Sequence, residues 1–301
     1  MNPPPRRCGR FAPSPTGDLH FGSLVAALGS WLMARHAGGG WLVRMEDLDP
    51  PREVPGAAER QLQALDAFGL VSDVPVLRQS QRGEAYAAAL RRLLDAGLAF
   101  ECRCSRSELV AAGGIHRACV GSRTRGPAAV RLKVPELTLA FDDGLQGPQS
   151  QALAREVGDF VLRRADGPWA YQLAVVVDDA AQGISDVVRG ADLLDSTPRQ
   201  IFLQRQLGLP TPAYAHLPLA VDDQGRKLGK SLAALPVDPA APMPALSAAW
   251  RFLGQPGQPF AGAGPVADAL ERALVQFDPA AIPRILHASV DAAVSGASRE
   301  T

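Results

Sequence analysis

The chain has 301 residues and a formal net charge of zero, with 47% apolar and 21% charged residues. These values are typical of a folded globular protein and exclude a disordered chain. A neutral balance also argues against a protein that holds nucleic acid through overall charge alone, while leaving room for a local basic patch.

The absence of a membrane-spanning run and of a signal peptide indicates the cellular compartment. No apolar run approaches the roughly 18 residues that a membrane span needs, and residues 1–7 lack the apolar segment of a signal peptide. We therefore expect a cytoplasmic monomer with no membrane partner. In that compartment the four cysteines are expected to be metal ligands rather than disulfides.

The first distinctive stretch is residues 10–23, which read RFAPSPTGDLHFGS. A short apolar strand leads into a turn with prolines and a glycine, and a helix follows with apolar residues at helical spacing from Leu24. The N–H groups and dipole at the start of that helix predict an anion site. His20 can donate to phosphate oxygens, and Gly22 lets a ligand approach the backbone. The alternative is a proline-rich surface turn before an ordinary helix.

Strand and helix patterns alternate after this stretch. A strand over residues 41–45 delivers Glu46 at its carboxyl end, and amphipathic helices are predicted over residues 56–69 and 82–97. The alternation predicts an α/β fold of Rossmann type, with a doubly wound parallel sheet.

A cysteine-rich segment interrupts the pattern. Cys102, Cys104, His116 and Cys119 surround a short helix with a capping box, which a glycine pair ends. Three thiolates and one imidazole suit tetrahedral zinc; the alternative is three free buried cysteines. From Cys102 to Lys133 the chain carries six Arg and one Lys against one Glu, a local net charge of +6 that predicts phosphate contacts.

The second half is expected to complete the sheet. From Asp159 the sheet is predicted to resume, with a strand over 160–162, a buried element over 171–179, a strand over 187–192 and a helix over 197–207. Residues 216–221 lead into a loop, and helices are expected near 244–253, 266–277 and 282–292. The final dozen residues are expected to be frayed.

The loop at 226–231 reads RKLGKS. The chain has 31 basic residues, of which only Lys133, Lys227 and Lys230 are lysines. Two of three lysines in one hexapeptide of an arginine-rich chain indicate a need for compact ammonium groups. They would stabilise charge on a departing pyrophosphate, with Mg²⁺ arriving on ATP. The alternative is a solvated charged loop.

Charged groups at strand ends suggest the second substrate. Arg10, Glu46 and Arg189, with Tyr171, match a molecule with two carboxylates and one ammonium, which is glutamate or aspartate. A carboxylate nucleophile is already ionised and needs no protein base. The alternative is that Arg10 and Glu46 merely pair with each other.

The stretch at 10–23 and the lysine loop together resemble the HIGH and KMSKS motifs of class I aminoacyl-tRNA synthetases. The run PSPTGDLHFG resembles the glutamyl branch more closely, while Ser23 and Gly229 depart from the two motifs. The resemblance implies the following roles: L-glutamate binding by Arg10, Ser14, Glu46, Tyr171 and Arg189; ATP binding by His20, Gly22, Ser23 and Lys230; catalysis by His20, Lys227 and Lys230. It also matches Cys102, Cys104 and Cys119 to zinc cysteines, with His116 where better-known members have Tyr.

The resemblance covers roughly residues 9–235, and the rest leaves little room for the anticodon-binding region of long members. It therefore points to the short branch, which activates glutamate without tRNA and transfers it to queuosine at the wobble position of tRNA(Asp). The implied organisation is 1–100 and 136–236 as halves of the catalytic domain, 101–135 as a zinc-binding insertion and 237–301 as a small helical region. The alternatives are a truncated synthetase that charges the 3′ end of tRNA(Glu) and a non-catalytic zinc-containing RNA-binding paralogue.

Overall fold

A central parallel sheet organises the molecule. The computed structural model describes residues 7–121, 126–221, 237–262 and 264–289. The sheet has the strand order β10-β9-β1-β2-β3, and all its pairings are parallel. Its strands are β1 (Cys8–Phe11), β2 (Gly40–Met45), β3 (Leu77–Arg78), β9 (Asp186–Gly190) and β10 (Ala213–Leu217). The order reverses between β1 and β9, so the predicted doubly wound fold is confirmed, and a ligand crevice is expected where these two strands end.

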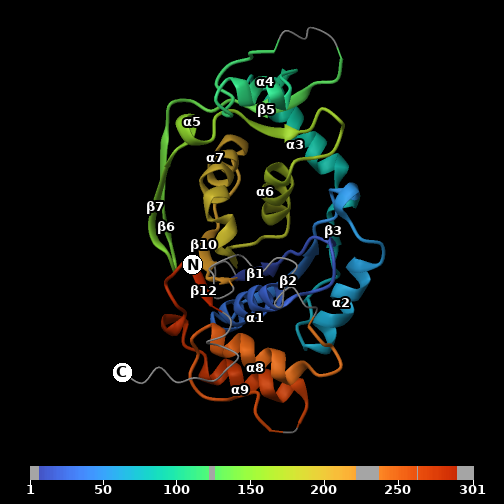
Figure 1. Cartoon of the computed structure of the whole chain (residues 1–301), viewed down its shortest axis with the longest axis vertical. Helices are drawn as coiled ribbons and strands as arrows, with labels where there is room; N and C mark the ends of the chain where they lie inside the picture. The colour runs from blue at the N-terminus through green and yellow to red at the C-terminus, as the bar shows by residue number, and fades with distance from the viewer. Residues whose placement is uncertain (1–6, 122–125, 222–236, 263, 290–301) are drawn as a thin grey trace, which may run out of the picture.

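Helices cover both faces of this sheet (Figure 1). They are α1 (Phe21–His36), α2 (Ala57–Ala67), α3 (Gly83–Asp95), α6 (Tyr171–Ala181) and α7 (Thr197–Leu207), with 3-10 turns η1 (Pro50–Arg52), η2 (Gln79–Gln81) and η3 (Ala191–Ser196). Two buried apolar clusters result, one around α1 and one around α6 and α7. The predicted helices at 56–69, 82–97 and 197–207 are confirmed within a few residues.

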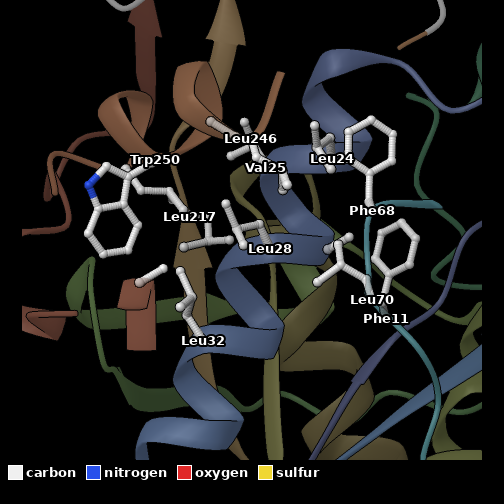
Figure 2. Close-up of a cluster of buried hydrophobic side chains, with 14 of the residues drawn as sticks. Phe11, Leu24, Val25, Leu28, Leu32, Phe68, Leu70, Leu217, Leu246 and Trp250 are labelled. Carbon is white, nitrogen blue, oxygen red and sulfur yellow. The ribbon is translucent and has the colours of Figure 1, made fainter. Parts of the chain in front are cut away.

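Helix α1 packs within the first of these clusters. Leu24, Leu28 and Leu32 are fully buried, and Figure 2 shows them among side chains from the sheet and from one C-terminal helix. A Cβ at Gly29 would lie 2.7 Å from Cδ1 of Leu217, so a larger residue would force this side chain at the end of β10 to move. The N-terminus of α1 is thereby fixed over the carboxyl edge of the sheet.

An insertion follows α3. It contains a three-stranded antiparallel sheet, the hairpin β6–β7 and two short helices: β4 (Ala99–Cys102), α4 (Arg106–Ala111), β5 (Ala129–Leu132), β6 (Thr138–Asp143), β7 (Gly147–Ala152), α5 (Leu153–Glu156) and β8 (Phe160–Arg163). The prediction that residues 160–162 resume the parallel sheet is wrong, because β8 pairs antiparallel with β5. A short apolar run is compatible with a parallel or an antiparallel strand, and the strand beside it determines which of the two forms.

The segment over 171–179 is helix α6. Residues 173–176 are all buried, so this helix is apolar on nearly every side and carries no amphipathic pattern. Its two acidic residues, Asp178 and Asp179, are also buried.

The C-terminal region packs beneath α1, at the opposite end of the molecule from α4 (Figure 1). Helices α8 (Pro242–Phe252) and α9 (Val266–Gln276) confirm two predictions. The predicted helix over 282–292 is wrong: a 3-10 turn η4 (Pro279–Ala281) precedes β12 (His287–Ser289), which pairs in parallel with β11 (Leu219–Val221). Pro283 disfavours helical backbone at Ile282, while β11 offers a free edge. Residues 290–301 lie outside the described residues.

Within the described ranges, no helix combines the length and apolar character needed to cross a membrane.

Candidate active site and metal centre

A cavity of about 1130 Å³ opens at the carboxyl ends of β1, β2 and β9. Its lining includes every described residue that the sequence predicted for glutamate or ATP: Arg10, Ser14, His20, Gly22, Ser23, Glu46, Tyr171 and Arg189. Lys227 and Lys230 lie outside the described residues. The sheet thus brings together groups that are up to 179 positions apart in the printed sequence.

His20 caps helix α1. Its Nδ1 accepts a hydrogen bond from the backbone N–H of Ser23 at 3.2 Å, and its Nε2 lies 3.1 Å from Oγ of Ser23. A Cβ at Gly22 would lie 3.2 Å from the His20 ring, so this glycine leaves room for the imidazole itself. Ser23, which departs from the HIGH pattern, is therefore the partner of His20.

A buried ion cluster adjoins the cavity, which two of its members, Arg10 and Glu46, line. Asp179 accepts hydrogen bonds from Nε of Arg10 at 3.2 Å and from Arg44 at 2.7 Å, and Arg44 also donates to Glu46 at 3.3 Å. Arg10 therefore pairs with Asp179 rather than with Glu46, contrary to the alternative weighed from the sequence. Burial opposes ionisation of Asp179, but Arg10 and Arg44 outweigh it and hold its pKa below the usual value.

Arg189 differs from Arg10 in its surroundings. It is 5% exposed, and its four hydrogen-bond partners in the described part of the chain are uncharged: Nε2 of His216, the hydroxyls of Tyr171 and Thr197, and the carbonyl of Leu193. A buried guanidinium without a carboxylate at its side suits an anionic ligand.

The predicted metal ligands do come together. The ligand atoms of Cys102, Cys104, His116 and Cys119 all lie within 4.8 Å of one another, and Nε2 of His116 lies 3.3 Å from Sγ of Cys102. Ligands around tetrahedral zinc are separated by roughly 3.5 Å, so three thiolates and an imidazole at this spacing fit the ion. The cluster can bind a metal.

The backbone around these ligands positions them and favours the thiolate form of Cys104. The capping box of Ser105 and Glu108 starts α4 as predicted. Burial opposes ionisation of Cys104, but backbone N–H groups of Gly121 and Val120, both 3.2 Å from its sulfur, lower its pKa. Thiolate is the form that binds metal.

Asp159 was not predicted from the sequence. Its Oδ2 lies 2.9 Å from Nδ1 of His116, and its backbone N–H donates to the carbonyl of His116 at 2.7 Å. The neighbouring Gly158 has φ +67°, and a Cβ there would lie 2.3 Å from that same carbonyl. A carboxylate behind a ligating imidazole fixes its tautomer and orientation.

Comparisons with known proteins agree with this architecture. Residues 8–119 and 115–238 match the family of tRNA synthetases class I (E and Q), catalytic domain. The chain is 61% identical to the glutamyl-Q tRNA(Asp) synthetase of Xanthomonas axonopodis pv. citri over 302 residues, covering 99% of this chain and all of that protein. It is 64% identical to that of Xanthomonas campestris pv. campestris (strain 8004), covering 95% of each chain.

Among solved structures, a glutamate tRNA ligase from Elizabethkingia meningosepticum in complex with its amino acid superposes with a TM-score of 0.78 at 26% identity. The match covers 95% of this chain and 67% of that one. The chain therefore belongs to the class I tRNA synthetases of the E and Q group, and within that class to the glutamyl-Q tRNA(Asp) synthetase family.

Proposed function

We propose that the protein activates L-glutamate with ATP in the absence of tRNA and then transfers the glutamate to queuosine at the wobble position of tRNA(Asp). The observation that carries the first step is the meeting of Arg10, Glu46 and Arg189 in one cavity beside the N-terminus of α1. The acceptor is supported by the name of relatives that are more than 60% identical over nearly the whole chain.

The charges suit the amino acid. Arg189 would receive a carboxylate of glutamate, and Glu46 would receive the ammonium. Arg10 already has Asp179 as a partner and would share its remaining N–H groups with the ligand. Tyr171, whose hydroxyl accepts from Arg189 at 3.3 Å, and Ser14 would complete the contacts.

The activation step needs placement rather than a base. A carboxylate oxygen of glutamate attacks the α-phosphorus of ATP, and the bond to the β-phosphate oxygen breaks as pyrophosphate leaves. His20 and the first turn of α1, including Gly22 and Ser23, would hold the phosphates, and Mg²⁺ would accompany ATP. Lys227 and Lys230 stay predicted contacts to the departing pyrophosphate.

In the second step a hydroxyl oxygen of the queuosine ring attacks the glutamyl carbonyl carbon, loses its proton and displaces AMP. Zinc, held by Cys102, Cys104, His116 and Cys119, would order the insertion without entering this chemistry. The cytoplasmic monomer stays an expectation. The 3′-charging and non-catalytic alternatives have no comparable support, because the relatives' name favours the queuosine acceptor and the cavity assembles the substrate contacts.

The test is glutamate-dependent exchange of labelled pyrophosphate into ATP with no RNA present. We expect exchange with glutamate and much less with glutamine, because a neutral amide beside buried arginines forfeits charge-assisted hydrogen bonds of about 1.5–3 kcal/mol each. Equal exchange with glutamine would contradict the roles of Arg10 and Arg189. No exchange with either amino acid would leave an RNA-binding protein as the better description.

A further inference from the structure

Behind Arg189, hydrogen bonds run away from the cavity to a buried carboxylate. Nε of Arg189 donates to Nε2 of His216 at 3.0 Å, and Nδ1 of His216 lies 2.5 Å from Oδ2 of Asp143. The three residues come from β9, β10 and the end of β6. The side chains of His216 and Asp143 are both fully buried, so water does not compete for these contacts.

The arginine fixes the state of the ring. A guanidinium can only donate, so Nε2 of His216 accepts and the ring proton must be on Nδ1, where it bonds to Asp143. Burial lowers the pKa of His216, and Arg189 adds to this, although Asp143 opposes it. Thr197 and the stacked ring of Tyr214 also face the imidazole without bringing charge. The contact with Arg189 and the lowered pKa of His216 both favour the neutral ring.

Asp143 is itself held in place. Its Oδ1 accepts backbone N–H groups from Leu145, Gln146 and His216 at 2.9–3.1 Å. Burial opposes its ionisation, but the hydrogen bond from His216 and the Gln146 N–H keep its pKa below the usual value. The β6–β7 hairpin, far from the cavity in sequence, is thereby tied to the strand that carries His216.

The outer nitrogens of Arg189 are positioned by the same arrangement. With Nε bound to His216, one terminal nitrogen lies 2.8 Å from Oγ1 of Thr197 and the other 3.3 Å from the hydroxyl of Tyr171. Direct pairing with Asp143 would neutralise the guanidinium. A neutral ring between them balances the buried charge at a distance and leaves the guanidinium free to attract a carboxylate.

We propose that His216, held by Asp143, is a positioning residue that aims Arg189 at a carboxylate of the amino-acid substrate. The proposal rests on the function proposed above, because it assumes that Arg189 binds glutamate. The β6–β7 hairpin, through Asp143, would thus take part in amino-acid recognition. Neither Asp143 nor His216 would touch the substrate.

The test compares two substitutions in the pyrophosphate exchange assay. His216→Phe keeps an aromatic volume but removes the acceptor, whereas His216→Gln can place its amide oxygen near the position of Nε2. We expect His216→Phe to raise KM for glutamate by about tenfold or more, the usual cost of a lost hydrogen bond to a charged group. KM for ATP should stay within about twofold, and His216→Gln should recover most of the loss.

Tyr214→Phe is the matched control. Tyr214 lies on the same strand as His216. The substitution keeps its ring and removes only a buried hydroxyl that bonds to Gln204 of α7 at 2.9 Å, so it should leave KM for glutamate unchanged. If His216→Phe raises both KM values equally, or if His216→Gln behaves like His216→Phe, the proposal is overturned. A wild-type protein without glutamate-dependent exchange would overturn the proposed function instead.

If His216→Phe fails to fold, the protonation of the His216 ring in the wild-type protein tests the proposal instead. Nitrogen NMR of histidine-labelled protein, with the signal assigned by its loss in His216→Gln, should show a neutral ring protonated on Nδ1 at neutral pH. A ring protonated on both nitrogens, or on Nε2 alone, would refute the arrangement.

Discussion

Glu46 is a carboxylate buried among arginines. Its side chain is 8% exposed, and burial raises its pKa above the ordinary value of 4.5, although Arg44 and Arg10 oppose the shift. The free enzyme therefore retains a proton on Glu46 at a higher pH than a surface glutamate would. The ammonium of the substrate, however, requires the ionised carboxylate.

A pH dependence of amino-acid binding follows. As pH falls through the raised pKa, Glu46 becomes protonated and KM for glutamate should rise. Glu46→Gln should raise KM by about tenfold or more, through loss of a charge-assisted hydrogen bond, and remove this part of the pH dependence. The measurement is KM for glutamate from weakly alkaline to weakly acidic pH.

The exposed Glu59, paired with Arg78 at 2.8 Å, gives the control for that experiment. Glu59→Gln makes the same chemical change outside the cavity and should retain the wild-type profile. An unchanged slope in Glu46→Gln would assign the titration to another group.

Residue types at strand ends predicted much of this site. Arg10, Glu46 and Arg189 were found because charged residues directly after or within short apolar strands mark the carboxyl edge of a parallel sheet. Arg44 and Asp179 were missed because their pairing spans 135 positions, and Asp143 and His216 because theirs spans 73. One sequence feature could have predicted Asp179: the acidic pair Asp178 and Asp179 directly follows an apolar run, which the fold buries.

At the scale of elements, the structure of the insertion depends on contacts between distant residues, which the spacing of the cysteines cannot predict. Spacing predicted the four metal ligands and the short helix between them. The carboxylate behind His116 comes from Asp159, 43 positions away, and is held by the backbone N–H of Val134 at 2.8 Å. A separation in sequence also hid the antiparallel pairing of β8, because its partner β5 lies about 30 positions earlier and only the folded insertion brings the two strands together.

Asp159→Ala should weaken zinc binding by about 10- to 100-fold, because the imidazole of His116 loses the group that orients it. Competition against a chromophoric chelator measures this without reference to catalysis. Asp166→Ala, which removes an exposed carboxylate bonded to Arg164, should bind zinc like the wild type. Equal zinc loss in Asp159→Ala and wild type would show that the histidine needs no such support.

At the scale of the whole molecule, the insertion and the C-terminal helices occupy opposite ends of the long axis, with the parallel sheet between them (Figure 1). The cavity nevertheless reaches the insertion, since Arg106 of α4 lines it together with Arg52 and Arg164. We infer that an RNA whose base enters the cavity meets the insertion with its backbone. The antiparallel strands of that insertion continue to Arg163. The zinc-binding insertion predicted over residues 101–135 therefore stays a proposal, and it concerns only the part that carries the metal ligands.

The rim of the cavity suits a phosphate backbone. The side chain of Arg52 is 76% exposed and that of Arg164 is 38% exposed. Arg52 pairs with Asp49, and Arg164 lies 3.7 Å from Asp49 and 2.6 Å from Asp166. Together with Arg106, the three arginines outnumber these two carboxylates and favour an anionic ligand. Transfer to RNA should therefore weaken as salt rises, whereas pyrophosphate exchange without RNA should respond much less.

The acceptor itself decides the proposed second step. We expect labelled glutamate to appear on tRNA(Asp) that carries queuosine and not on the same tRNA without it, because the adenylate needs a correctly placed hydroxyl more than a base. Periodate is unsuitable for blocking the 3′ end, since it would also cleave the vicinal diol of queuosine. The informative control is tRNA(Asp) that carries queuosine but lacks its 3′-terminal adenosine, which should accept glutamate as well as the intact molecule. Loss of transfer to this truncated tRNA, or labelling of tRNA without queuosine, would place the ester at the 3′ end and overturn the assigned acceptor.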